Sequence, residues 1–140
     1  ARVMYAATLA FNGTTANGRK SGDWAAHGLG HILSLLYDTP HGASLSIVYP
    51  AWMRLHADRA PERLSALGSA LFGAESTAET IESFERLFSE LDSPIRLSQI
   101  GIGSDRRDEL LDHAEKACVS GLNHKLDADD RARLVDLMME

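Results

Sequence analysis

Apolar residues recur at intervals of three and four along most of the chain, the spacing that places them on one face of an α-helix. The clearest example lies between residues 76 and 91, where one face carries Ile81, Phe84, Leu87, Phe88 and Leu91. Only residues 45–49 form a short β-branched run that resembles a strand. The pattern therefore predicts an all-α fold.

Turn residues divide this pattern into about seven predicted helices. The second runs from Trp24 toward Tyr37 with Asp23 as its N-cap, and the third begins near Gly42. Pro50 lies inside the third helix and should kink it or split it in two, because proline lacks an amide hydrogen. The other predicted helices cover residues 4–11, 61–72, 76–91, 105–119 and 127–139, with Ser104 and Asp127 as N-caps of the last two.

Length and composition favour a single domain and exclude several functions. The chain has 140 residues, of which 44% are hydrophobic, enough for one core. Fourteen Lys and Arg against 20 Asp and Glu give a net charge of −6, so we expect no nucleic-acid partner. The longest apolar run, residues 43–53, is shorter than the ~20 residues of a membrane span. Cys118, the only cysteine, excludes an internal disulfide and fits a cytoplasmic location.

Three of the six histidines fall within fifteen residues, at positions 27, 31 and 41. His27 and His31 are four residues apart on a predicted helix, so both can reach one ion or one substrate. A pair on the surface or at the edge of the core has the same spacing. Gly28 and Gly30 beside them each disfavour a helix by about 0.8–1.0 kcal/mol relative to Ala. They favour either close approach of a cofactor or substrate, or a close helix crossing.

His41 can return to His27 only through a tight turn at residues 38–40. A helix reaching Leu36 carries the chain roughly 13 Å past His27, and five extended residues cover at most about 17 Å. Two histidines alone are too few for a catalytic metal, which normally takes three or more protein ligands. Carboxylates of this chain, or residues of a segment outside it, would have to complete such a site.

The string from His27 to His31 (HGLGH), followed by Pro40-His41-Gly42, resembles the iron-containing alcohol dehydrogenase family. That family has an Ala-His-x-Leu-Gly helix, a second histidine fourteen residues later in a Pro-His-Gly turn, and an apolar helix that reaches a proline. Asn12-Gly13 before the helix and Pro50 after it stand in the same order here. His31 is typical of the butanol dehydrogenase or aldehyde reductase branch.

The resemblance implies a metal site and a cofactor. His27 and His41 would be two of four ligands to iron(II) or zinc, and the family's other two ligands, an aspartate and a histidine, lie on an upstream helix that this chain does not contain. The metal would polarise an alcohol or carbonyl oxygen while NADH or NADPH exchanges hydride. His31, one helical turn from His27, would relay the alcohol proton or hydrogen-bond to a ligand; both roles stay open.

By this resemblance, residues 1–140 form a single helical metal-binding C-terminal domain without the nucleotide-binding N-terminal domain. We expect the chain alone to bind metal weakly and to be inactive, and the family implies an alcohol or aldehyde substrate and a possible homodimer. One alternative is a stand-alone helical domain that binds a metal or a partner without redox activity. A weaker one is a small enzyme that uses His27 and His31 as acid and base. His56, His113 and His124 match no motif and are expected at the surface or core edge.

Overall fold

The computed structural model describes residues 1–18 and 21–140 and confirms the all-α prediction, since no strand occurs in those ranges. The segment from Gly18 to Gly22 (GRKSG) has the composition of a loop, and its residues Arg19 and Lys20 lie outside the described residues. The helices are α1 (Arg2–Phe11), α2 (Ala25–Tyr37), α3 (His41–Leu55), α4 (Pro61–Phe72), α5 (Thr77–Glu90), α6 (Arg107–Lys116) and α7 (Ala128–Met139), with 3-10 turns η1 (Thr14–Ala16), η2 (Leu97–Ile100) and η3 (Ser104–Arg106).

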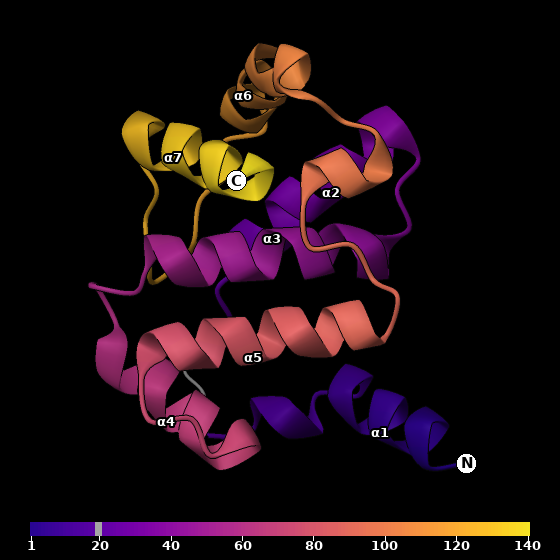
Figure 1. The fold of residues 1–140 in the computed structure, drawn as a ribbon, viewed down its shortest axis with the longest axis vertical. Helices are drawn as coiled ribbons and strands as arrows, with labels where there is room; N and C mark the ends of the chain where they lie inside the picture. The colour runs from indigo at the N-terminus through magenta and orange to yellow at the C-terminus, as the bar shows by residue number, and fades with distance from the viewer. Residues whose placement is uncertain (19–20) are drawn as a thin grey trace.

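Helix α3 is the central element of the molecule (Figure 1). It packs against α2 and α7 on one side and against α5 on the other, while α4 packs against α5 and α6 against α7 and α2. The main core lies among α2, α3, α6 and α7 and includes Leu29, Leu33, Ile47, Leu110, Leu134 and Met138. A smaller core of Met53, Leu64 and Ile81 joins α3, α4 and α5. The large core therefore fixes α2 against α3.

Helix α1 differs from the others because none of its residues is buried. Val3, Met4, Tyr5 and Phe11 are between 68% and 95% exposed. No helix of the part of the chain that the structure describes is long and apolar enough to span a membrane.

The prediction that Pro50 splits the third helix was wrong. Helix α3 continues from His41 to Leu55 with Pro50 inside it. The proline forgoes one backbone hydrogen bond, but its ring is buried with Val48 and Ala51 in the interior. Apolar burial therefore stabilises the continuous helix despite the missing donor.

The predicted helix at 105–119 is also shorter than expected. Ser104 does not cap it but begins the 3-10 turn η3, and α6 ends at Lys116. Cys118 then takes a left-handed conformation with φ of 49°, which ends the helical path. The Asp127 cap is confirmed, since its Oδ1 accepts a hydrogen bond from the Asp130 amide at 2.8 Å.

Candidate metal centre

The turn between α2 and α3 brings His41 back to α2. Asp38 lies in the left-handed region with φ of 52°, and Pro40 is the N-cap of α3, so His41 is that helix's first residue. The Ser44 amide donates to the Pro40 carbonyl at 2.9 Å, which closes the first turn of α3. The tight turn that the return of His41 requires is therefore present.

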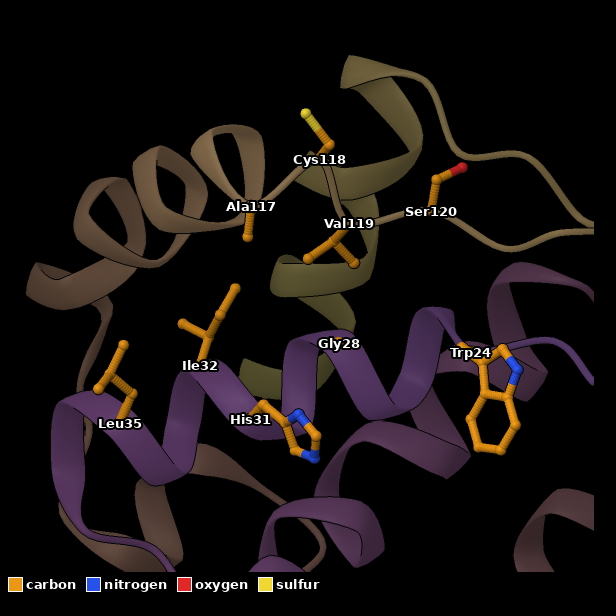
Figure 2. A pocket seen from close by; sticks show the side chains of 9 residues that line it. All are labelled: Trp24, Gly28, His31, Ile32, Leu35, Ala117, Cys118, Val119 and Ser120. Carbon is orange, nitrogen blue, oxygen red and sulfur yellow. The ribbon is translucent and has the colours of Figure 1, made fainter.

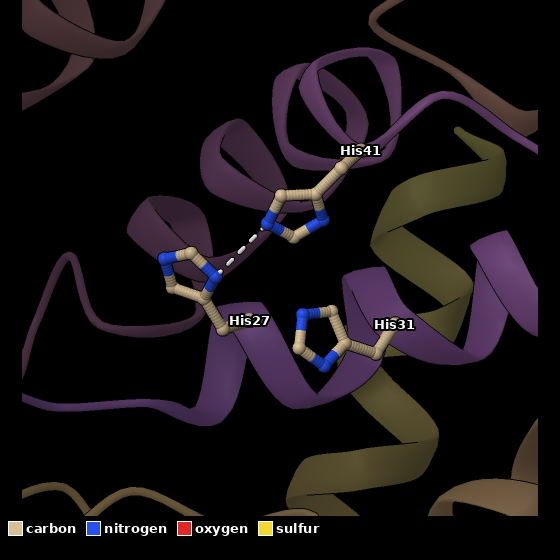
Figure 3. A group of neighbouring side chains, drawn as sticks. All are labelled: His27, His31 and His41. Carbon is tan, nitrogen blue, oxygen red and sulfur yellow. Dashed lines mark hydrogen bonds between the residues drawn. The ribbon is translucent and has the colours of Figure 1, made fainter. Parts of the chain in front are cut away.

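His27, His31 and His41 lie together on one side of the α2–α3 pair (Figure 3). Nδ1 of His27 is 3.2 Å from Nε2 of His41. The ring centroid of His41 is 5.1 Å from that of His27 and 4.9 Å from that of His31. One nitrogen from each of the three rings lies within 4.8 Å of the other two. No other group of this kind occurs among residues 1–18 and 21–140.

The His27–His41 pair has the geometry that two imidazole ligands need. Metal–nitrogen bonds of about 2.0–2.1 Å place two ligand nitrogens about 3.0 Å apart at a right angle and about 3.4 Å apart at the tetrahedral angle. The observed separation of 3.2 Å lies between these values. The two residues therefore fit a shared divalent metal without backbone movement.

Electrostatics keep His27 in the form that binds metals. Burial lowers the pKa of its imidazole, and positive charge on His41 or His31 lowers it further. The neutral ring has the free lone pair that a metal needs. A metal ion bound by His41 would lie close to the N-terminal end of α3, where the helix dipole is positive. The repulsion between the ion and this dipole would cost about 0.3–1 kcal/mol. That cost is small beside the free energy of metal–ligand bonds.

The two glycines between the histidines have different roles. A Cβ on Gly30 would lie 3.0 Å from Oγ of Ser44 and 3.2 Å from Cδ2 of Leu45, so this glycine permits the close crossing of α2 and α3. Gly28 instead faces Val119 and lines a cleft. The helix-crossing interpretation therefore holds for Gly30, while Gly28 leaves room at the surface of α2.

A cleft of about 380 Å³ borders His31, between α2 and the segment that follows α6 (Figure 2). Apolar side chains of Trp24, Ile32, Leu35 and Val119 line much of it. Trp24 is 55% exposed and its ring centroid is 5.2 Å from that of His27, so its ring lies beside the histidine group and not in the core. An apolar cleft therefore lies directly beside the exposed histidine group.

Asp23 connects the start of α2 to a distant loop. The predicted N-cap was wrong by one residue, because α2 starts at Ala25 and its N-cap is Trp24. Oδ1 of Asp23 still accepts a hydrogen bond from the Ala25 amide at 3.3 Å. Its Oδ2 accepts from the His124 amide at 2.9 Å. A Cβ on Gly121 would approach both carboxylate oxygens to 2.3 Å, so only glycine fits beneath Asp23.

Sequence reasoning missed a second histidine group in the interior. His56 has no exposed surface, against the expectation of a surface or core-edge residue. Its ring stacks on that of Trp52 at a centroid distance of 4.2 Å, and the His124 ring meets its edge at 5.0 Å. The spacing of four residues between Trp52, in α3, and His56, the C-cap of α3, was the signal for this contact.

Fold and site together define a helical domain with a histidine-based candidate metal centre at the junction of two helices. A model of the "Fe-containing alcohol dehydrogenase family, C-terminal" matches residues 1–137. The chain belongs to this family, as the histidine motif indicated.

Similar sequences and solved structures support the family assignment. The chain is 30% identical over 136 residues to the "Probable NADH-dependent butanol dehydrogenase 1" of Bacillus subtilis, a match that covers 91% of this chain and 35% of that protein. It superposes on the NADH-dependent butanol dehydrogenase A of Thermotoga maritima with a TM-score of 0.90 and 31% identity, covering 97% of this chain and 38% of that one. It also superposes on Escherichia coli YqhD with a TM-score of 0.85 and 30% identity, covering 96% of this chain and 36% of that one.

The chain spans about a third of the length of these relatives. YqhD is named an NADPH-dependent aldehyde reductase, so relatives of both cofactor types are similar to this chain.

Proposed function

We propose that residues 1–140 form the single helical, metal-binding C-terminal domain of an alcohol dehydrogenase or aldehyde reductase that uses NADH or NADPH. Family membership and the names of the relatives support the reaction class. The observation that carries the proposal is the 3.2 Å separation between the ring nitrogens of His27 and His41. Cofactor binding is assigned mainly to the part of the relatives' length that this chain does not span.

His27 and His41 are proposed to hold iron(II) or zinc. When bound, such a metal acts as a Lewis acid on the oxygen of an alcohol or aldehyde. The protein's contribution is to favour the neutral imidazole of His27, through its lowered pKa, and to hold the two rings at a fixed separation, through the packing of α2 on α3. Metals of this type accept imidazole ligands readily, which agrees with a donor set made of histidines.

His31 is proposed to move a proton at the substrate oxygen. It follows His27 by one helical turn, is exposed, and borders the apolar cleft. An imidazole at this place can accept the proton of an alcohol or return it to an alkoxide near neutral pH. The side chains of Trp24 and Ile32 along the cleft would exclude water from the same region.

The proposal extends to the state of the whole protein. We propose that the chain alone has no dehydrogenase activity, because the remaining ligands and the cofactor site would come from other segments. We further propose a cytoplasmic homodimer; the single, exposed Cys118 agrees with a reducing compartment. Light scattering of the full-length protein tests the dimer.

The test is an assay of the protein expressed from the complete reading frame that contains this chain. After anaerobic loading with iron(II) or zinc(II), oxidation of NADH and of NADPH is followed with butanal as substrate. We expect His27→Ala and His41→Ala to lose bound metal together with activity. His31→Ala should keep its metal and lose about 10²–10⁴-fold in kcat, the range typical of a general acid–base group.

His113→Ala is the matched control, because His113 lies on α6 outside the site. It should leave metal content and kcat unchanged. Full activity of the His27→Ala variant, or of a metal-free preparation, would contradict the proposal.

A further inference from the structure

The third histidine of the exposed group has a geometry that proton relay alone does not require. His31 lies four residues after His27 on α2, so both side chains point from the same face of one helix. A nitrogen of its ring lies within 4.8 Å of the ligand nitrogens of both His27 and His41. The three nitrogens surround one point in space from two helices (Figure 3).

We infer that His31 is a third metal ligand whenever this chain binds a metal with its own residues, so that His27, His31 and His41 form a self-contained three-imidazole site. The inference rests on the proposed function only for the roles of His27 and His41 as ligands. This inference changes what we expect of the chain alone. Three histidines should bind one metal ion specifically, whereas two histidines would bind it only weakly.

The movement that His31 needs is small. Three nitrogens on one metal lie about 3.0–3.4 Å apart, and the His27–His41 pair already has this spacing. The His31 nitrogen therefore has to approach by roughly 2 Å or less. Its side chain is exposed and has two rotatable bonds, so rotation about them brings the nitrogen closer without displacing any core residue.

The backbone that carries the three ligands is rigid. Helices α2 and α3 are locked by buried Leu33 and Ile47 and by the close crossing at Gly30. The hydroxyl of Ser44 donates to the His41 carbonyl at 2.8 Å and holds the first turn of α3. A site on such elements loses little conformational freedom when the metal binds.

The donor set determines which ions fit. Three neutral nitrogen ligands suit zinc, cobalt, nickel and copper, whereas magnesium and calcium require oxygen ligands. The nearby Asp23 carboxylate is engaged by the amides of Ala25 and His124. The site therefore takes a transition metal with three protein ligands and leaves at least one position open for water or a substrate oxygen.

The test is titration of the 140-residue chain with zinc(II), followed by calorimetry and by NMR of the imidazole nitrogens. We expect one zinc per chain, and shifts of three imidazoles but not of His56, His113 or His124. His27→Ala, His31→Ala and His41→Ala should each weaken zinc binding about tenfold or more, and His113→Ala should not. Magnesium should not compete. Circular dichroism of each variant checks the fold.

Two results would overturn the inference. In the first, His31→Ala binds zinc as tightly as the unchanged chain, while His27→Ala and His41→Ala lose it; the metal then has two ligands here. In the second, the unchanged chain binds no zinc. Neither result affects the proposed function, which fails if the loaded full-length protein reduces no aldehyde, or if full activity remains without His27 or without metal.

Discussion

The two histidine groups of this domain use the same side chain in opposite surroundings. In the exposed group, His27, His31 and His41 direct ring nitrogens toward one another, with the closest pair 3.2 Å apart. In the interior, His56 lies flat against Trp52 with an interplanar angle of 13°. Its Nδ1 lies 3.2 Å from the Trp52 carbonyl oxygen, and its Nε2 is buried with no hydrogen-bond partner among the described residues.

Ring orientation, more than the number of histidines, therefore distinguishes a group of metal ligands from a group packed in the core. A metal requires lone pairs that converge and can shed water. A stacked ring such as that of His56 presents its face, and contributes apolar area and dispersion instead. We therefore expect substitutions in the two groups to affect different properties.

The largest expected effect is on stability, and it should be confined to the interior group. His56→Ala removes a fully buried ring and leaves a cavity against Trp52, so the free energy of unfolding should fall by about 2–4 kcal/mol. His31→Ala, on the surface, should change it by less than about 0.5 kcal/mol. Urea denaturation with a chelator present measures both. If both variants lost the same free energy of unfolding, the two histidine groups would not differ in their contribution to stability.

A smaller effect is expected at Asp23, which connects the two groups. Asp23→Ala removes the acceptor of the Ala25 amide, near His27, and that of the His124 amide, near His56. We expect a loss of about 1–2 kcal/mol, because two partly buried amides lose their acceptor. Asp58→Ala is the matched control for charge, because Asp58 is exposed.

The NMR spectrum gives this prediction a second measurement. In Asp23→Ala, the amide signals around both His27 and His124 should shift, whereas Asp58→Ala should shift neither. If Asp23→Ala is as stable as the unchanged protein, the two hydrogen bonds do not hold the α2 N-terminus to the loop at 121–124.

Much of the fold follows from local sequence patterns, and the parts that do not follow depend on tertiary packing. Apolar periodicity located the seven helices of the described residues, because an apolar face repeats with the helical period. Pro50 was misread because the burial that keeps α3 continuous involves residues distant in sequence. The burial of His56 was missed for the same reason, since the His124 ring that packs against it comes from the far end of the chain.

The candidate site shows the same division. The spacing of His27 and His31 and the short turn to His41 made their proximity predictable from chain geometry. The apolar cleft beside His31 was not predictable, because Val119 reaches it from a segment almost ninety residues away in sequence. Similarly, the choice between two roles for Gly30 required the position of Ser44 on the crossing helix.

The smallest expected effect is a pH dependence of stability that comes from the interior group. Burial lowers the pKa of His56 below 6.5, and the positive charges of His124 and Arg59 lower it further, although the Trp52 carbonyl and Asp23 oppose this. With a folded-state pKa below the unfolded value, the unfolded chain binds the proton more readily. The contribution is therefore fully present above pH 6.5 and is lost as the pH falls below that value.

Comparison with a variant isolates this contribution. In His56→Phe the ring that stacks on Trp52 is retained and the titration is removed, so the slope of stability between about pH 6.5 and 5 should flatten. Any contribution of His27 to the pH dependence is the same in the unchanged protein and in His56→Phe, so it cancels in the comparison. Arg59 holds the pKa of the Asp130 carboxyl below its usual value, so that neighbour stays charged in this range. Chemical denaturation at several pH values with a chelator present, with His113→Phe as control, measures the slope. An unchanged slope in His56→Phe would mean that water reaches the protonated ring, and that the interior group is less enclosed than its packing indicates.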